Sequence, residues 1–296
     1  MNAIPTGRLL RGTLARGQAR ALFCETTQMG SAATKIHTAS AVCAAALSRG
    51  LSGVALLTAA TEDTTSSLTM TIKGGGPAGA LVVVAHGRRL KAYMDHPCVS
   101  LPSRTDGKLD VGGAIGAHGQ ITIIRDMGLR EPYIGQCPLA NGEIAEDIAL
   151  YCTMSEQQPT LCALGALVAG DTVLSSGGLM VQPLPGCDEE TLSMLELRAP
   201  VYGDLSRHLL ETPLEELYLD FFRDLYPEIH AIEPLALACD CSTERMERVL
   251  ISLGRAALEE MIADHHNTEI SCNFCAKKHT FSETALTKLL AEAFEP

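Results

Sequence analysis

The chain lacks long hydrophobic runs, because none of its uninterrupted apolar stretches approaches the roughly 18 residues that a membrane-spanning helix needs. Its first ten residues also lack the continuous apolar segment of a secretory signal peptide. The cysteine count is 11, and an odd number argues against the disulfide framework of a secreted protein. We therefore expect a cytoplasmic protein, in a reducing compartment, that does not act at a membrane.

Signatures of common enzyme classes are missing as well. Gly74-Gly75-Gly76-Pro77 lacks the Gly-Lys-Ser/Thr ending of a phosphate-binding loop, and strand-like residues follow it where a helix should begin, so we expect a turn. No Ser-His-Asp set or pair of carboxylates stands out in residues 1–187. Basic charge is also in deficit, with 23 Lys and Arg against 35 Asp and Glu, and affinity for nucleic acid depends on Lys and Arg. We expect neither an enzyme nor a nucleic-acid-binding protein.

The net charge of −12 is unevenly spread and divides the chain into three segments. Residues 1–187 carry 14 basic and 13 acidic side chains, residues 188–231 carry three and 11, and residues 232–296 carry six and 11. The net charges of these segments are therefore +1, −8 and −5. A chain of 296 residues is long enough for one large core and at least one smaller domain.

The first segment is rich in Gly, Ala, Val and Thr and mixes strand patterns with helix patterns. The predicted strands are Ala21 to Thr26, Ser67 to Ile72, Leu81 to Ala85, Ile121 to Arg125 and Leu179 to Gln182. Helical patterns cover Ala32 to Ser48 and Gly142 to Met154. The mixture predicts an α+β fold in which sheets pack on helices.

The second segment contains a strongly amphipathic helix pattern from Leu214 to Tyr226. Thr212-Pro213-Leu214-Glu215 matches a capping box with proline at the first helical position. Five of the chain's 12 aromatic residues lie between residues 188 and 231, among many acidic ones. We expect the apolar side of this helix to dock on the first segment, and the helix to depend on its neighbours for order.

Four cysteines form two close pairs, Cys239-Asp240-Cys241 and Cys272-Asn273-Phe274-Cys275, with 30 residues between them. Four thiolates from two short knuckles suit a closed tetrahedral zinc site. Thiols so close in sequence can also form strained local disulfides, so the pattern indicates a redox switch. A dithiol oxidoreductase would place its pair at a helix N-terminus, whereas strand patterns flank the second pair here and favour metal binding. The other seven cysteines are scattered, and we expect them to be buried: Cys24, Cys43, Cys98, Cys137, Cys152, Cys162 and Cys187.

The third segment is small for an independent domain. Ser242 is placed to cap a helix that ends at Gly254, a second short helix follows, and Ser282 is placed to cap the last helix. Units of about 65 residues are marginal without a staple. Zinc binding contributes roughly 10–16 kcal/mol in zinc-finger peptides, so we expect loss of the metal to unfold this segment.

The spacing of Cys239-Asp240-Cys241-Ser242, Ser252-Leu253-Gly254 and Cys272-Asn273-Phe274-Cys275 resembles the redox-regulated heat-shock chaperones of thirty-three kilodaltons. The likeness extends upstream through Gly74-Gly75-Gly76-Pro77, Gly142 to Asp147, Ser155-Glu156-Gln157 and Gly177-Gly178-Leu179, and so covers nearly the whole chain. Two departures are Gly75, where the family usually has an acidic residue, and His279, where it has a tyrosine. We expect four cysteines, and not His279, to form the metal site.

The resemblance implies a chaperone core domain (residues 1–187), a charged helical linker (188–231) and a zinc-binding redox-switch domain (232–296). In the reduced state Cys239, Cys241, Cys272 and Cys275 would hold one zinc per chain. On oxidation they would form the disulfides Cys239–Cys241 and Cys272–Cys275, and the last segment would unfold.

The oxidised protein would then bind unfolding client proteins without ATP, and would form a homodimer. The candidate client-binding residues are Leu214, Leu217, Tyr218, Phe221, Phe222 and Leu225. A thiol-disulfide oxidoreductase and a constitutive zinc-binding scaffold remain as alternatives.

Overall fold

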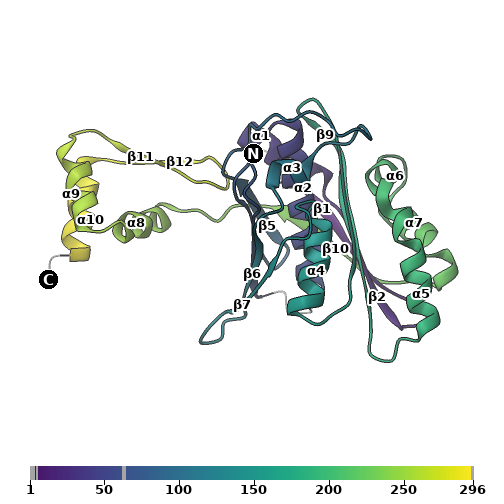
Figure 1. Ribbon diagram of the computed structural model, residues 1–296. Coiled ribbons are helices and arrows are strands. Elements are labelled where there is room, and N and C mark those ends of the chain that lie inside the picture. The colour runs from purple at the N-terminus through teal and green to yellow at the C-terminus, as the bar shows by residue number, and fades with distance from the viewer. Residues whose placement is uncertain (1–3, 5, 62–64, 295–296) are drawn as a thin grey trace. The chain divides into compact units, whose positions relative to one another are not determined.

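The computed structural model describes residues 4, 6–61 and 65–294, and the chain divides into two compact units, Met1–Ala238 and Cys239–Pro296 (Figure 1). Both units combine helices with strands, which confirms the expected α+β class.

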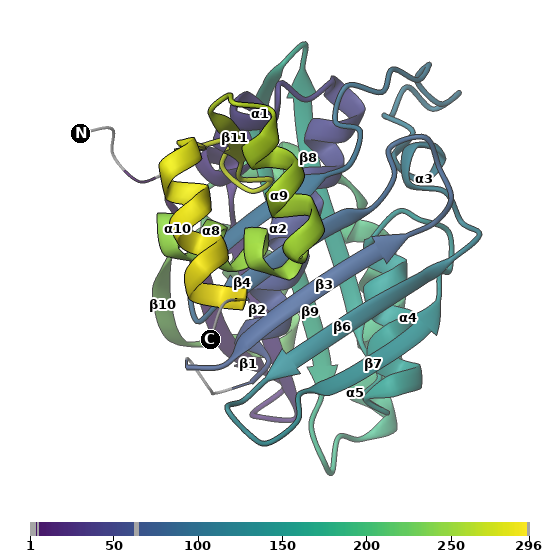
Figure 2. The same ribbon diagram turned by 90° about the vertical axis from the view of Figure 1, so that its left-hand side faces the viewer.

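A ten-stranded sheet forms the framework of the first unit. Its strands are β1 (Thr6–Leu14), β2 (Ala19–Glu25), β3 (Ser67–Lys73), β4 (Leu81–His86), β5 (Arg89–Met94), β6 (Gln120–Asp126), β7 (Tyr133–Pro138), β8 (Leu161–Ala169), β9 (Thr172–Pro183) and β10 (Glu228–Leu237). Their order is β7-β6-β3-β4-β5-β10-β1-β2-β9-β8. Within the described residues, neighbouring strands of this sheet are antiparallel except β10 and β5, which are parallel. Figure 2 looks onto β3, β6 and β7 at one end of this sheet, with α4 behind them.

One face of the sheet packs on the helices α1 (Thr27–His37) and α2 (Ala41–Ala59). The sequence pattern predicted one helix from Ala32 to Ser48, but the chain breaks at Thr38, which adopts a left-handed backbone with φ 50°. By length and composition α2 could cross a membrane, yet 89% of its apolar window is buried inside the unit, as in the core helix of a folded protein. It packs against strands from both halves of the sheet, among them β4, β5, β8 and β9.

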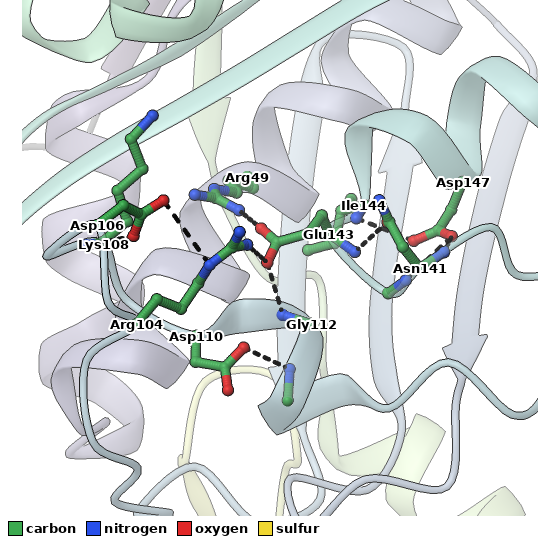
Figure 3. Close-up of polar contacts among 12 residues, drawn as sticks. Arg49, Arg104, Asp106, Lys108, Asp110, Gly112, Asn141, Glu143, Ile144 and Asp147 are labelled. Carbon is green, nitrogen blue, oxygen red and sulfur yellow. Dashed lines mark hydrogen bonds and ion pairs between the residues drawn. The ribbon is translucent and has the colours of Figure 1, made fainter.

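The loop before α4 (Ala145–Ser155) is held by two carboxylates (Figure 3). Asp147 is fully buried and accepts four backbone N–H bonds, two of them from Gly142 at 3.2 Å and Ile144 at 2.9 Å. These bonds hold Ile144 at φ 73°, a conformation that a β-branched residue rarely adopts. The Glu143 carboxylate accepts hydrogen bonds from the guanidinium groups of Arg49, at 2.5 Å, and Arg104, at 3.1 Å. The short helix α3 (Val111–Ile115) joins the same network through the Gly112 amide, at 3.1 Å from Glu143.

The other face of β1, β2 and β9 is covered by a helical layer. This layer comprises α5 (Glu189–Arg198), a 3₁₀ turn (Ala199–Asp204), α6 (Leu205–Glu211), α7 (Leu214–Phe221) and a second 3₁₀ turn (Arg223–Leu225). Figure 1 shows α5, α6 and α7 stacked beside β2. Side chains alternate along β2, so Leu22 and Cys24 face α2 while Ala21 and Phe23 face the helical layer.

Two details of the predicted linker helix are wrong. Thr212 ends α6 in an extended conformation, and Pro213 precedes α7 without a side-chain capping bond, so no capping box forms. The helix ends at Phe221 rather than Tyr226, because Phe222 leaves the helical region and Tyr226 is left-handed at φ 49°.

The strand β10 follows the helical layer and returns to the middle of the large sheet. Residues 232–238 therefore belong to the first compact unit, whereas the sequence placed them at the start of the zinc-binding domain. The second unit begins at Cys239.

The second unit contains three helices and a hairpin. These elements are α8 (Thr243–Ser252), α9 (Arg255–Ala263), β11 (Thr268–Ser271), β12 (Lys278–Phe281) and α10 (Glu283–Phe294). The predicted caps are confirmed, since Ser242 Oγ accepts from the Arg245 amide at 3.3 Å and Ser282 Oγ from the Ala285 amide at 3.2 Å. Among the described residues its apolar core holds six buried side chains: Met246, Leu250, Leu258, Phe281, Leu286 and Leu289.

Candidate metal and redox centre

The two cysteine pairs occupy two different kinds of local structure in the second unit. Cys239 and Cys241 lie in the extended segment before α8, whose N-cap is Ser242. Cys272 and Cys275 lie in the loop that joins β11 to β12, so the expected strand-knuckle-strand arrangement is present. This loop is closed by the Cys272 amide, which donates to Lys277 O at 2.9 Å, and by the Ala276 amide, which donates to Cys272 O at 2.8 Å.

The fold brings the four sulfur atoms together. All four lie within 4.8 Å of one another, and the Cys239–Cys272 and Cys241–Cys275 sulfurs are 3.7 and 3.5 Å apart. A tetrahedral site with metal–sulfur bonds of about 2.3 Å places its sulfurs about 3.8 Å apart. A disulfide would need about 2.05 Å, and all 11 cysteines are free. The geometry therefore fits four ligands around one metal ion.

The protein environment shifts the pKa values of the four thiols in different directions. Burial raises the pKa of Cys239, Cys241 and Cys275. Burial acts in the same direction at Cys272, but the backbone N–H groups of Phe274 and Cys275 donate to its sulfur and hold its pKa below the usual thiol value. A coordinated metal deprotonates its thiols outright, so this cluster holds four thiolates when a metal is bound.

His279 stands apart from the cluster. It lies in β12 opposite Ile270, is only 5% exposed, and is not one of the four grouped ligands. Its Nε2 has no hydrogen-bond partner among the described residues.

The remaining cysteines lie in the first unit, mostly in or near its core. Cys24, Cys43, Cys137 and Cys152 are buried, Cys162 and Cys187 are half-buried, and only Cys98 is exposed, contrary to expectation. Burial raises the pKa of Cys24 and Cys152 to about 12, so these thiols stay protonated and unreactive at neutral pH.

The six candidate client-binding residues form one apolar surface, here called the linker face. Leu214, Leu217, Tyr218, Phe221, Phe222 and Leu225 are each at most 9% exposed. The Phe222 ring lies 5.3 Å from that of Tyr218 and 5.7 Å from that of Tyr202, between ring centroids. The linker face is thus assembled but covered in this structure.

The linker face is covered by residues that the sequence analysis did not identify. These residues, here called the core face, are Leu10, Leu14, Ala19, Ala21, Phe23, Leu179 and Val181. Alternation of apolar side chains along β2 was the available signal, because Ala19, Ala21 and Phe23 share one side of a strand. Polar contacts add to the docking, since Arg8 pairs with Glu215 and the Tyr218 hydroxyl donates to Thr13 O and Glu228 O at 3.3 Å each.

Comparison with known proteins agrees with this arrangement. Residues 7–282 match the family model described as Hsp33 protein. A 33 kDa chaperonin of Alkaliphilus oremlandii is 41% identical over 290 residues, which cover 96% of each chain. One of Acetivibrio thermocellus is 39% identical over 287 residues, covering 95% of this chain and 96% of that one. The crystal structure of the Thermotoga maritima 33 kDa chaperonin matches with a TM-score of 0.87 at 31% identity, covering 98% of this chain and 99% of that one. The chain therefore belongs to the Hsp33 family, and it is a chaperone rather than an enzyme.

Proposed function

We propose that this chaperone is a redox-regulated, ATP-independent holdase that binds unfolding proteins after its four paired cysteines are oxidised. The observation that carries the proposal is the gathering of four sulfurs within 4.8 Å in a unit whose described residues bury only six core side chains. A core of this size is only marginally stable without a metal or disulfide cross-link. Metal binding or oxidation at the thiols therefore controls whether the unit is folded.

Zinc suits this donor set, at one ion per chain in the reduced protein, because four thiolates form a closed tetrahedral shell. When bound, zinc would supply a structural cross-link between the two knuckles, worth roughly 10–16 kcal/mol in zinc-finger peptides. Cys239 and Cys241 would hold it from the segment before α8, and Cys272 and Cys275 would hold it from the hairpin loop.

Oxidation would convert these ligands into groups that no longer bind metal. With peroxide as the oxidant, two thiolates, two protons from solvent and one peroxide yield one disulfide and two waters, and two such steps consume all four thiolates. The pairs Cys239–Cys241 and Cys272–Cys275 lie within single knuckles. A disulfide within a knuckle leaves the two knuckles unlinked. A disulfide between the knuckles would replace the cross-link lost with the zinc. Pairing within each knuckle therefore suits a unit that must unfold.

In this proposal residues 1–187 are the chaperone core, residues 188–231 the linker, and residues 239–296 the switch, with residues 232–238 completing the core sheet. Loss of the switch would loosen the linker and uncover the linker face and the core face together. Large apolar patches of this kind bind other proteins. Unfolding clients would bind there in the cytoplasm, and two activated copies would cover part of the same surface as a homodimer.

The test is suppression of aggregation of a thermally unfolding client by reduced and by peroxide-treated protein, without ATP. We expect suppression only after oxidation, and its loss when reductant and zinc are restored. Equal binding in both states would indicate a constitutive scaffold. Catalytic turnover in an insulin-reduction assay would indicate an oxidoreductase, although the second cysteine pair lies in a hairpin loop rather than at a helix N-terminus.

A further inference from the structure

The strand β10 is the least buried member of the middle of the sheet. Of its ten residues only Leu235 is fully buried, while Ile229 and Ile232 are 36% and 41% exposed. Its neighbour β1 is anchored on both faces, since Leu9, Leu10 and Leu14 are fully buried. The two strands therefore differ in what holds them: side-chain packing for β1, and mainly the backbone ladder for β10.

The direction of the β10 ladder follows from two hydrogen bonds. The amides of Ala236 and Ala238 donate to Arg88 O and Leu90 O, at 3.0 and 2.9 Å, and so point toward β5. Amides alternate along a strand, so those of Glu233 and Leu235 point toward β1, where the register sets them opposite Leu9 and Gly7.

Pro234 is tolerated because its missing N–H would have pointed toward β5. At that position the β5 pairing, which covers only Ala236 and Leu237, has not begun. The β5 side thus holds β10 over a short stretch, and the β1 side carries most of the ladder.

One acidic side chain fixes β10 in place. Glu233 pairs with Arg88 and, at 3.5 Å, with Arg11 on β1. The Arg88 guanidinium is largely buried, and its Nη1 and Nη2 have no hydrogen-bond partner among the described residues. Arg88 therefore needs an acidic group at this position of the strand that lies between β1 and β5.

The sequence connects β10 directly to the candidate switch. Only Ala238 separates the end of β10 from Cys239, and the linker runs into β10, since residues 228–231 belong to both. If both flanking segments lose order, β10 keeps only its ladder, the Glu233 contacts and one fully buried side chain, Leu235, as its main anchors. Its departure would leave β1 at a sheet edge with a row of unpaired amides and carbonyls, which is a template for another strand.

We infer that the β1 edge uncovered by β10 is a client-binding site that receives an extended apolar segment of an unfolding protein by strand addition. The preferred segment carries an acidic residue opposite Leu9, in the place of Glu233, so that the largely buried Arg88 guanidinium again faces a carboxylate. Main-chain hydrogen bonds supply the affinity, which suits a chaperone that must accept many sequences. This inference rests on the proposed redox activation.

The experiment uses the full-length oxidised protein and a synthetic peptide with the sequence Glu228–Leu237. Added in trans, the peptide should compete with a thermally unfolding client and relieve the suppression of its aggregation. The same peptide N-methylated at Glu233 and Leu235 cannot donate toward β1, and we expect it to inhibit at least about tenfold more weakly because two ladder bonds are lost. The matched control is N-methylated at Ile232 and Ala236, whose amides point away from β1, and it should inhibit like the unmodified peptide.

Amide exchange at Gly7 and Leu9 gives an independent readout. These amides should be protected in the reduced protein, exchange at least about tenfold faster after oxidation, and regain protection with client or peptide. Protection that persists while anti-aggregation activity rises would overturn the inference, as would equal inhibition by the two N-methylated peptides. Protection regained without client, in proportion to protein concentration, would assign the edge to β10 of a second copy and would also overturn it. An oxidised protein without anti-aggregation activity would instead contradict the proposed function.

Discussion

Truncation of Phe222 should activate the chaperone without oxidation. Its side chain is fully buried at the centre of the linker face, with aromatic neighbours on two sides, Tyr202 and Tyr218. Phe222→Ala should therefore weaken docking of the linker on the core face while leaving the four cysteines untouched.

The expected loss of docking free energy is large for a single layer of short helices. Buried Phe→Ala substitutions cost about 3–5 kcal/mol, and each well-placed aromatic pair contributes about 0.5–1.5 kcal/mol beyond area burial. Since about 1.4 kcal/mol corresponds to a factor of ten, the fraction of undocked linker should rise by roughly two to three and a half orders of magnitude. Whole domains are stable by only about 5–15 kcal/mol, so local opening at this layer becomes appreciable.

The assay compares reduced, zinc-loaded protein with and without the substitution. Phe222→Ala should retain its zinc, lose exchange protection across residues 188–225, and suppress client aggregation without peroxide. Leu219→Ala is the matched control, because Leu219 lies on α7 just before Phe222 but is 44% exposed, and surface changes usually stay within about 0.5 kcal/mol. Loss of protection in the linker with full zinc and no gain of activity would refute the idea that linker docking is what blocks client binding.

Three further predictions concern the switch and the linker. Cys272→Ser should lower zinc retention and make the chain sensitive to limited proteolysis from residue 239 onward even without oxidant; stoichiometric zinc with native-like resistance would show that Cys272 is not a ligand. A chelator added to the reduced protein should remove roughly 10–16 kcal/mol of stabilisation and abolish the helical signal of α8 to α10, as followed by exchange, while strands β1 to β9 of the large sheet stay folded. Hydrogen bonding from Arg8 lowers the pKa of Glu215, so its contribution to linker docking is present at neutral pH and is lost as pH falls through that lowered pKa. Glu215→Gln should remove this pH dependence of linker exchange, and an unchanged profile would assign it to another group.

The candidate site was largely accessible from sequence because its information is local. Two cysteine pairs, a serine before each following helix and a polar strand on either side of the second pair are short-range patterns, and the structure brings the four sulfurs together as expected. The strands β2, β3, β4, β6 and β9 were found for the same reason, since their apolar residues alternate or run together.

What the sequence did not predict depends on tertiary contacts. Glu228–Leu237 contains Pro234 and has little alternation of apolar and polar residues, so no local pattern predicts a strand. It forms a strand by hydrogen bonding to β1 on one side and β5 on the other. Thr212-Pro213 matches a capping box by residue type, but Thr212 is the C-cap of α6 and does not cap the start of α7. The core face is formed by β1 and β2 together with β9, which lies far from them in sequence, so its pairing with the linker face could not be derived from either segment alone.

The most direct test of the redox switch follows zinc release, free thiols, amide exchange and anti-aggregation activity in one sample during peroxide treatment. We expect about one zinc to be released per chain as four thiols disappear. Residues 188–296 should lose protection, and activity should rise in parallel with zinc release, while residues 6–61 and 65–187 stay folded. Full activity in a protein that retains its zinc and keeps residues 188–296 protected would contradict the proposed redox switch.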